Sequence, residues 1–205
     1  MIDRVPRRFR LGFSRSVERP ADVAVAEPED SPDEVAFVAY GEDCLLSGRT
    51  LLEGDRLSDM LNVRDEYVLI GVTVERFDGG EPFEVEEVTV PRDEIFMVHG
   101  SERRGNPSRR HRTMPQHLAI KMGPYRVRGD FHTLPGADPV DAFRRRKNMV
   151  PLTDARIEYT IRGQTRETQV DAVIVNREQI DWLEAVAPNQ ATFPEGPKRL
   201  VAKPT

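Results

Sequence analysis

The chain has one cysteine, Cys44, among 205 residues. A single thiol excludes an internal disulfide and any metal site built from several cysteines. It also fits a reducing compartment, so we expect a cytoplasmic protein. For Cys44 itself we expect the role of a small apolar residue on a strand, because free cysteine is among the most buried residue types.

Long apolar runs are also missing. No segment approaches the roughly 18 consecutive apolar residues that indicate a membrane span, and the basic start, with Arg4, Arg7, Arg8 and Arg10, lacks the apolar core of a secretory signal. We therefore expect a protein without membrane contact. The net charge of -5 argues against a protein that coats nucleic acid over its whole surface, but it leaves room for a local basic patch.

Motifs of common catalytic and metal sites are absent as well. A nucleophile elbow would show Gly-x-Ser-x-Gly, and a phosphate-binding loop would show Gly-Lys-Ser/Thr after its first glycine; neither occurs in the sequence. The four histidines, His99, His111, His117 and His132, include no pair at zinc-protease spacing. We predict no catalytic residue, no metal ligand and no cofactor; an enzyme with an acid/base pair is an alternative that no convergent set of residues supports.

What the sequence does contain is a repeat. Val90–Val98, VPRDEIFMV, aligns with Val175–Leu183, VNREQIDWL. Each copy has an apolar strand end, a polar turn with an arginine and an acid, and then an isoleucine. Ordered matches over a whole supersecondary unit indicate a duplicated structure. Further matches at a similar spacing of about 83 residues are Leu52–Leu61 with Leu134–Phe143 and Gly48 with Gly129.

The repeat and the composition divide the chain into six segments. Repeats of roughly 65 residues bury little core alone, so we expect them to pack on each other or on a second chain. Acidic or proline-rich segments with few apolar residues do not bury enough surface to fold. The segments are a basic arm (1–17), an acidic proline-rich linker (18–34), a first β-rich repeat (35–100), an arginine-rich connector (101–116), a second β-rich repeat (117–187) and a proline-rich tail (188–205).

Within the repeats, periodicity predicts strands and one short helix each. Apolar residues alternate over 68–74 and are followed by Asp78-Gly79-Gly80, which predicts a hairpin. The returning strand changes phase near Glu86-Glu87, where we predict a β-bulge. For the helices we predict Asp55 as the cap of the first, and Asp138 before Pro139 as the start of the second.

The end of each unit resembles the last two strands of Sm-like and SH3-like small barrels, in which one turn separates a long bent strand from a short final one. The resemblance and the repeat imply a mainly β fold of two duplicated small β-barrel-like or β-sheet units, each with one short helix, related by pseudo-two-fold symmetry. A helix after the first strand departs from the Sm-like pattern, and no nucleotide-binding residue of that family is matched. The residues that carry the resemblance are Val170–Asn176, Arg177–Gln179 and Ile180–Leu183, with Val85–Val90 and Ile95–Val98 in the first copy.

Clustered arginines are the candidate binding residues. In the connector they could contact phosphate or an acidic partner, or they could form a solvated linker that folds back on the acidic segment. At the end of the second helix they could bind an anion or compensate the helix dipole. The candidates are Arg103, Arg104, Arg109, Arg110, Arg112, Arg144, Arg145 and Arg146.

These observations favour a non-enzymatic interaction or scaffold protein. Its partner would be another protein or a second copy, bound through the strand edges that small sheets leave available. The alternative is a nucleic-acid-binding protein that uses the arginine-rich connector, whose binding would weaken steeply with salt.

Overall fold

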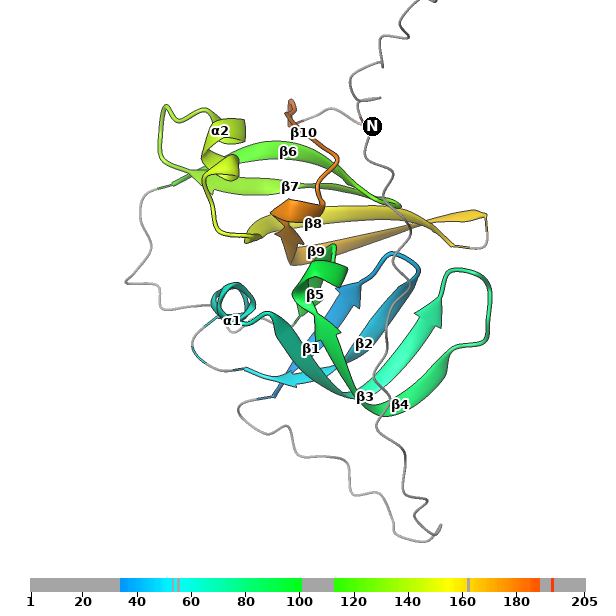
Figure 1. Ribbon diagram of the computed structural model, residues 1–205. Coiled ribbons are helices and arrows are strands. Elements are labelled where there is room, and N and C mark those ends of the chain that lie inside the picture. Colours follow the sequence, from blue (N-terminus) through cyan, green and yellow to red (C-terminus); the bar gives the residue numbers. More distant parts are fainter. Residues whose placement is uncertain are drawn as a thin grey trace, which may run out of the picture.

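The computed structural model describes residues 34–52, 54, 56–100, 113–161, 163–188 and 193. The predicted basic arm, almost all of the acidic linker, residues 101–112 of the connector and most of the tail lie outside these residues. The described part has an N-terminal half, residues 34–100, and a C-terminal half, residues 113–188. Both halves consist mainly of strands (Figure 1).

The two halves have the same order of elements. The N-terminal half contains β1 (Glu34–Tyr40), β2 (Cys44–Leu51), α1 (Leu57–Val63), β3 (Glu66–Arg76), β4 (Phe83–Pro91), the 3-10 turn η1 (Arg92–Glu94) and β5 (Met97–Gly100). The C-terminal half contains β6 (Met114–Met122), β7 (Tyr125–Thr133), α2 (Pro139–Arg144), β8 (Met149–Ile161), β9 (Gln164–Asn176), the 3-10 turn η3 (Arg177–Gln179) and β10 (Trp182–Ala185).

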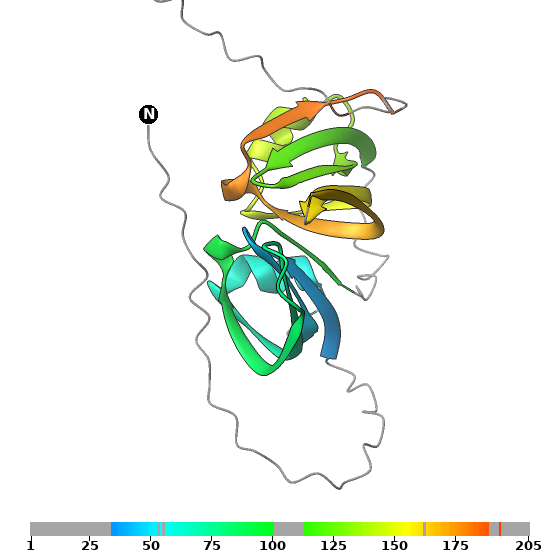
Figure 2. The ribbon, with the colours of Figure 1, turned by 90° about the vertical axis from the view of Figure 1, so that its right-hand side faces the viewer.

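All ten strands belong to one antiparallel sheet, in the order β10-β6-β7-β8-β9-β5-β1-β2-β3-β4. The halves lie one above the other in Figures 1 and 2 and meet where β5 pairs with β9. The first and last strands of this order, β10 and β4, each pair with only one strand of the described part. The mainly β fold with one short helix in each half is therefore confirmed, whereas the sheet is open and does not close into a barrel.

The contact between the halves joins unlike edges. β5 is the last strand of the N-terminal half, and β9 is the penultimate strand of the C-terminal half. A two-fold axis would pair like edges, or would make the β10–β4 contact as well. Strand pairing in the described residues thus gives the pseudo-two-fold arrangement no support, and it stays a prediction.

Two details differ from the sequence prediction. β6 already starts at Met114, inside the predicted connector, because Met114 pairs with Thr133 at the end of β7. The phase change in β4 is present, since Val88 is buried and Val85 only partly so, but the β3–β4 ladder keeps one register across it. Gly71, with φ of 59°, lies opposite this point, so both strands change phase together without an extra residue.

The bulges instead lie in β3 and β8, each opposite one of two equivalent glycines. Register shifts fall at Gly48 in the β2–β3 ladder and at Gly129 in the β7–β8 ladder. A Cβ on Gly48 would lie 3.0 Å from the Ile70 carbonyl oxygen, and one on Gly129 would lie 3.1 Å from Leu152 Cβ. Both positions therefore bring backbone close to the neighbouring strand, which favours glycine.

The helices follow their predicted positions, with different caps. Asp138 caps α2 by accepting a hydrogen bond from the Asp141 backbone N–H at 2.8 Å, and Pro139 is the first helical residue, as predicted. α1 starts after Arg56, which provides no side-chain cap, and Asp55 lies outside the described residues.

The core consists of two apolar clusters, and each one includes side chains from both halves. The cluster of the N-terminal half contains Met149 and Ile174 from β8 and β9. The cluster of the C-terminal half contains Tyr40, Phe96 and Met97 from the other half. The halves therefore pack on each other, as expected for units this small.

Candidate functional site

The contact between the halves, which we call the internal interface, starts with strand pairing. Met97 lies opposite Val175, and Val98 lies opposite Ile174. The Asn176 backbone N–H donates to the Phe96 carbonyl at 2.8 Å. One half thus adds its last strand to the exposed edge of the other, which is the geometry of β-strand addition.

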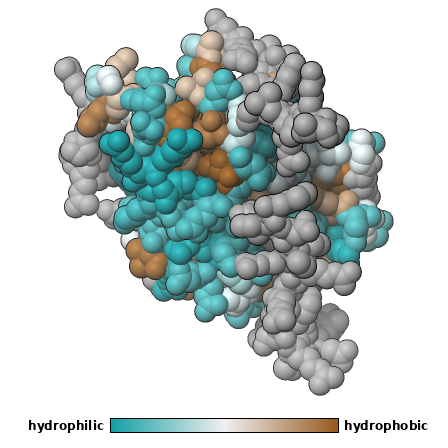
Figure 3. Space-filling model, turned by 45° about the horizontal axis from the view of Figure 1, so that its top comes forward, coloured by the Kyte–Doolittle hydropathy of each residue, from teal (hydrophilic) through white to brown (hydrophobic). Residues whose placement is uncertain are grey.

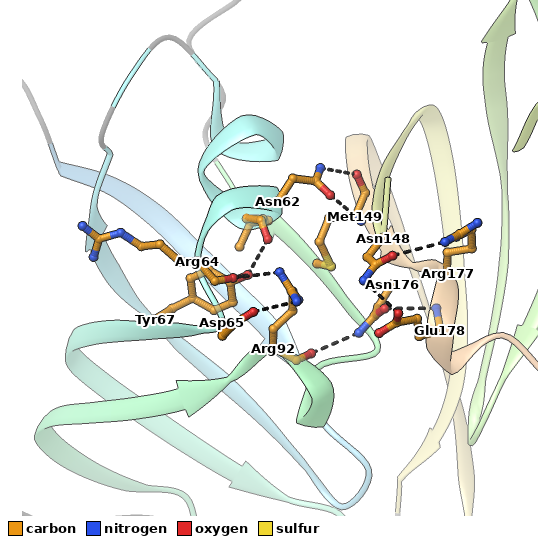
Figure 4. Close-up of polar contacts among 11 residues, drawn as sticks. Asn62, Arg64, Asp65, Tyr67, Arg92, Asn148, Met149, Asn176, Arg177 and Glu178 are labelled. Carbon is orange, nitrogen blue, oxygen red and sulfur yellow. Dashed lines mark hydrogen bonds and ion pairs between the residues drawn. The ribbon is translucent and has the colours of Figure 1, made fainter. Parts of the chain in front are cut away.

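Asn176 fixes this pairing with its side chain. It is fully buried, and its Nδ2 donates to the carbonyls of Ile95 at 2.9 Å and Arg92 at 3.0 Å. Its Oδ1 accepts a hydrogen bond from the Glu178 backbone N–H at 3.1 Å. One amide therefore connects η1 of the N-terminal half to η3 of the C-terminal half (Figure 4).

Asn62, at the end of α1, makes a second polar connection. Its Nδ2 donates to the Met149 carbonyl at 2.8 Å, and its Oδ1 accepts from the Met149 N–H at 3.0 Å (Figure 4). The side-chain amide thus pairs with the first residue of β8 as a neighbouring strand would. Sequence reasoning missed both asparagines: Asn62 belongs to no motif, and Asn176, although it lies in the repeated stretch, was not recognised as an interface residue.

Aromatic side chains fill the interface beside these amides. Tyr40 meets Tyr125 edge-on with ring centroids 5.5 Å apart, and Tyr159 at 6.0 Å. Phe77 stacks on Tyr159 at 6.0 Å, and Phe96 lies 5.6 Å from Tyr125. Such pairs stabilise an interface beyond the apolar area that they bury.

Two hydroxyls of this cluster have hydrogen-bond partners. The Tyr125 hydroxyl donates to the Gly41 carbonyl, and burial raises the pKa of Tyr125 well above its usual value. The Tyr40 hydroxyl lies 3.1 Å from His99 Nδ1. Burial raises the pKa of Tyr40 and lowers the pKa of His99, so both groups favour their neutral forms.

Equivalent arginines show how the two halves correspond. The Arg92 N–H donates to the Asp65 carbonyl at 2.7 Å, and its guanidinium lies 2.7 Å from the Asp65 carboxylate. The Arg177 N–H donates to the Asn148 carbonyl at 2.7 Å, and its guanidinium donates to the Asn148 side chain at 3.2 Å. In each half the first residue of the 3-10 turn therefore holds the residue that precedes the long strand.

This correspondence shows which residues at the free edges β4 and β10 are equivalent to the residues of the internal interface. Pro91 precedes Arg92 as Asn176 precedes Arg177, and Glu66 follows Asp65 as Met149 follows Asn148. The β4 edge thus has a proline where β9 has the buried asparagine. β10 is the equivalent of β5, since each follows its 3-10 turn and pairs with the first strand of its half.

The two free edges differ in charge. Along β4 the exposed charged residues are acidic, beside exposed Phe83 and the exposed Val68 and Ile70 of β3. Beside β10 the end of α2 is basic, although Asp141 of α2 and Glu184 of β10 are also exposed, and Lys121, opposite Trp182, is partly buried. Trp182 and Leu183 of β10 are themselves partly buried. The acidic residues are Asp65, Glu66, Glu84, Glu86 and Glu87, and the basic residues of α2 and its end are Arg144, Arg145, Arg146 and Lys147.

The predicted arginine sites are only partly described. Arg103, Arg104, Arg109, Arg110 and Arg112 lie outside the described residues. Arg144, Arg145 and Arg146 are exposed at the end of α2. The guanidinium of Arg146 donates to the His132 carbonyl at 3.3 Å and lies 5.5 Å from the ring centroid of Phe131.

The remaining candidates for chemistry do not form a common site. Cys44 is buried, as predicted, and burial raises its pKa to about 12, which keeps the thiol protonated. His117 lies 2.5 Å from the Asp130 carboxylate on the β6–β7 ladder. Within the described residues, no group of three or more His, Cys, Asp or Glu side chains could hold a metal ion. Neither α1 nor α2 is long and apolar enough to cross a membrane.

Comparisons with known proteins return no relative. No protein-family model matches the chain, and no curated protein or solved structure matches it.

Proposed function

We propose that this chain is a non-enzymatic interaction protein that binds its partner by strand addition at the edges β4 and β10. The observation that carries the proposal is the internal interface, where one unit of this element order already receives a strand from another. β4, which corresponds to β9, and β10, which corresponds to β5, lie at the ends of the sheet, and neither pairs with a second strand among the described residues. Unpaired backbone groups along an edge are a template for a further strand.

The composition of the surface supports binding through the backbone of a strand edge, and not through a large apolar contact area. Hydrophilic residues predominate on the face shown in Figure 3, with hydrophobic residues in small groups. The exposed large hydrophobic side chains of the described part are spread over several elements. They are Leu51, Val63, Val68, Ile70, Phe83, Met114 and Leu134.

Site-specific photo-crosslinking tests the proposal. A benzophenone side chain would be placed at Thr89 on β4 or Ala185 on β10, with exposed Glu42 in the β1–β2 turn as the control position. We expect crosslinked products in cells from the two edge positions and none from position 42. Absence of products at both edges, or the same products from position 42, would overturn the proposal.

A second candidate function is nucleic-acid binding through basic residues. The exposed Arg144 at the end of α2 and Arg145, the residue after it, favour this function, together with the five arginines between residues 101 and 112. Phosphate contacts would release counterions, so binding to a labelled duplex would fall steeply with salt. Replacing the connector arginines and Arg144 with alanine should then abolish binding; unchanged affinity would exclude this function.

A further inference from the structure

We infer that the partner of the β4 edge is the β10 edge of a second copy of this chain. This inference rests on the proposed function and names its partner. The internal interface supplies the geometry: β5 lies on β9 with Val98 opposite Ile174. In the equivalent contact between copies, Leu183 of one copy lies opposite Thr89 of the next.

The backbone of both edges fits this register. Arg92 donates to Asp65, so in the antiparallel ladder the Val90 backbone groups face β3 and those of Thr89 face outward. Val186 donates to His117, so the backbone groups of Leu183 face away from β6 in the same manner. Thr89 and Leu183 therefore each present a donor and an acceptor at the open sides of the sheet.

Charge favours the same pairing. The repeat places Arg144 at the position of Asn62, and Glu66 at the position of Met149. Asn62 and Met149 are hydrogen-bonded across the internal interface. A second copy in the equivalent position therefore brings exposed Arg144, at the basic end of α2, against exposed Glu66 at the start of β3. Glu184 of β10 is also exposed, so the attraction is local to this pair.

The contact between copies is weaker than the internal one. Pro91 lacks the N–H that Asn176 donates to Phe96. The polar Thr89 and Glu66 replace Ile174 and Met149, which are buried in the N-terminal core. We therefore expect a reversible, salt-sensitive association of whole chains rather than a permanent dimer.

The pairing is head-to-tail, so each copy keeps one free edge of each kind. Repetition gives rings or open chains instead of a symmetric dimer. Masses above that of a dimer of the 23.3 kDa chain are the corresponding signature.

Charge reversal with sedimentation velocity tests the inference on the full-length chain. Glu66→Arg and Arg144→Glu should each weaken self-association about fivefold or more at low salt, because each puts like charges together. The chain with both reversals should recover association, since every contact again joins opposite charges. Glu42→Arg, on an exposed turn, should leave association unchanged.

Proline variants that prevent strand pairing at one edge provide a second test. Thr89→Pro and Leu183→Pro each remove an outward N–H without removing a ladder bond. Either variant alone should stay monomeric, and an equimolar mixture should stop at a heterodimer. Thermal unfolding of each variant checks that it is folded.

The outcomes separate this inference from the proposed function. A parent chain that stays monomeric at all concentrations and salt conditions, or reversals without mutual rescue, would overturn the inference. If crosslinks from Thr89 to other proteins persist in that case, the proposed function stands. If those crosslinks are also absent, both fail.

Discussion

Asn62 and Met149 are joined by two hydrogen bonds, from Nδ2 to the Met149 carbonyl at 2.8 Å and from the Met149 N–H to Oδ1 at 3.0 Å. The side chain of Asn62, in α1 of the N-terminal half, thereby satisfies both backbone groups of the first residue of β8 in the C-terminal half. At the free edges the residues equivalent to Asn62 and Met149 are Arg144 and Glu66. The two halves therefore have the same order of elements but carry different residues at this position.

Asn62→Ala should lower the free energy of unfolding by about 1–3 kcal/mol, because it leaves a donor and an acceptor of Met149 without partners. Urea denaturation at neutral pH measures this change. Arg144→Ala, at the equivalent exposed position, is the matched control and should change stability by about 0.5 kcal/mol or less. Equal effects of both variants would contradict the role given to Asn62.

Asn176→Ala should lower the free energy of unfolding by about 3 kcal/mol, since the buried Ile95 carbonyl and the Glu178 N–H lose their partner and the Arg92 carbonyl keeps only the Ile95 N–H. Pro91→Ala, the equivalent change at the free edge, should lower the free energy of unfolding by less than about 1 kcal/mol. Chemical denaturation of the pair reports the difference. Similar losses from the two substitutions would show that Asn176 does not hold the halves together.

Gly100→Ala should destabilise the chain by about 1–3 kcal/mol, as an overpacked site does. A Cβ there would overlap the Ala36 carbonyl oxygen where β5 pairs with β1, and it would lie 3.2 Å from Leu57 Cδ2. Gly80→Ala is the control, because its nearest neighbour would be Asp78 Oδ1 at 3.6 Å. Thermal unfolding should show a lower Tm for Gly100→Ala alone.

Stability should fall in alkaline solution. Burial raises the pKa of Tyr40, of Tyr125 and, to about 12, of Tyr67. The unfolded tyrosines ionise near pH 10, before the folded ones, so their contribution is complete below pH 10 and is lost as the pH rises toward the folded values.

The alkaline loss can be measured residue by residue. Denaturation from about pH 8 to pH 12 should give a decline of about 1.4 kcal/mol per pH unit for each such tyrosine. Tyr67→Phe should make the decline less steep between pH 10 and the folded pKa of Tyr67. An unchanged slope would contradict the burial of this hydroxyl, which donates to the Leu61 carbonyl at 2.6 Å.

Local sequence patterns predicted the elements well, because they depend on neighbouring residues. The Asp78-Gly79-Gly80 turn gave the hairpin of β3 and β4, and the repeated VPRDEI and VNREQI stretches gave the 3-10 turns η1 and η3. The alternation over 68–74 does not mark one buried face, because Val68 and Ile70 are exposed whereas Val72 and Val74 are buried. The repeat also gave one helix in each half. These features follow from periodicity and turn chemistry alone.

The joining of the halves was not predictable in the same way. Periodicity shows which face of a strand is buried, but it does not show which edges pair across some 80 residues. A signal for the internal interface was nevertheless present in the alignment, where Pro91 stands opposite Asn176. A proline and an amide at one repeat position indicate a strand end that is free in one copy and paired in the other.

Amide hydrogen exchange measured by NMR, at low and high chain concentration, tests the central claim most directly. At low concentration the outward N–H groups of Thr89 and Leu183 should exchange rapidly, while those of Val98 and Asn176 at the internal interface stay protected. At high concentration Thr89 and Leu183 should become protected together, and Glu66→Arg should prevent this. Exchange at both edges that is independent of concentration, in a chain whose mass does not change, would contradict the account.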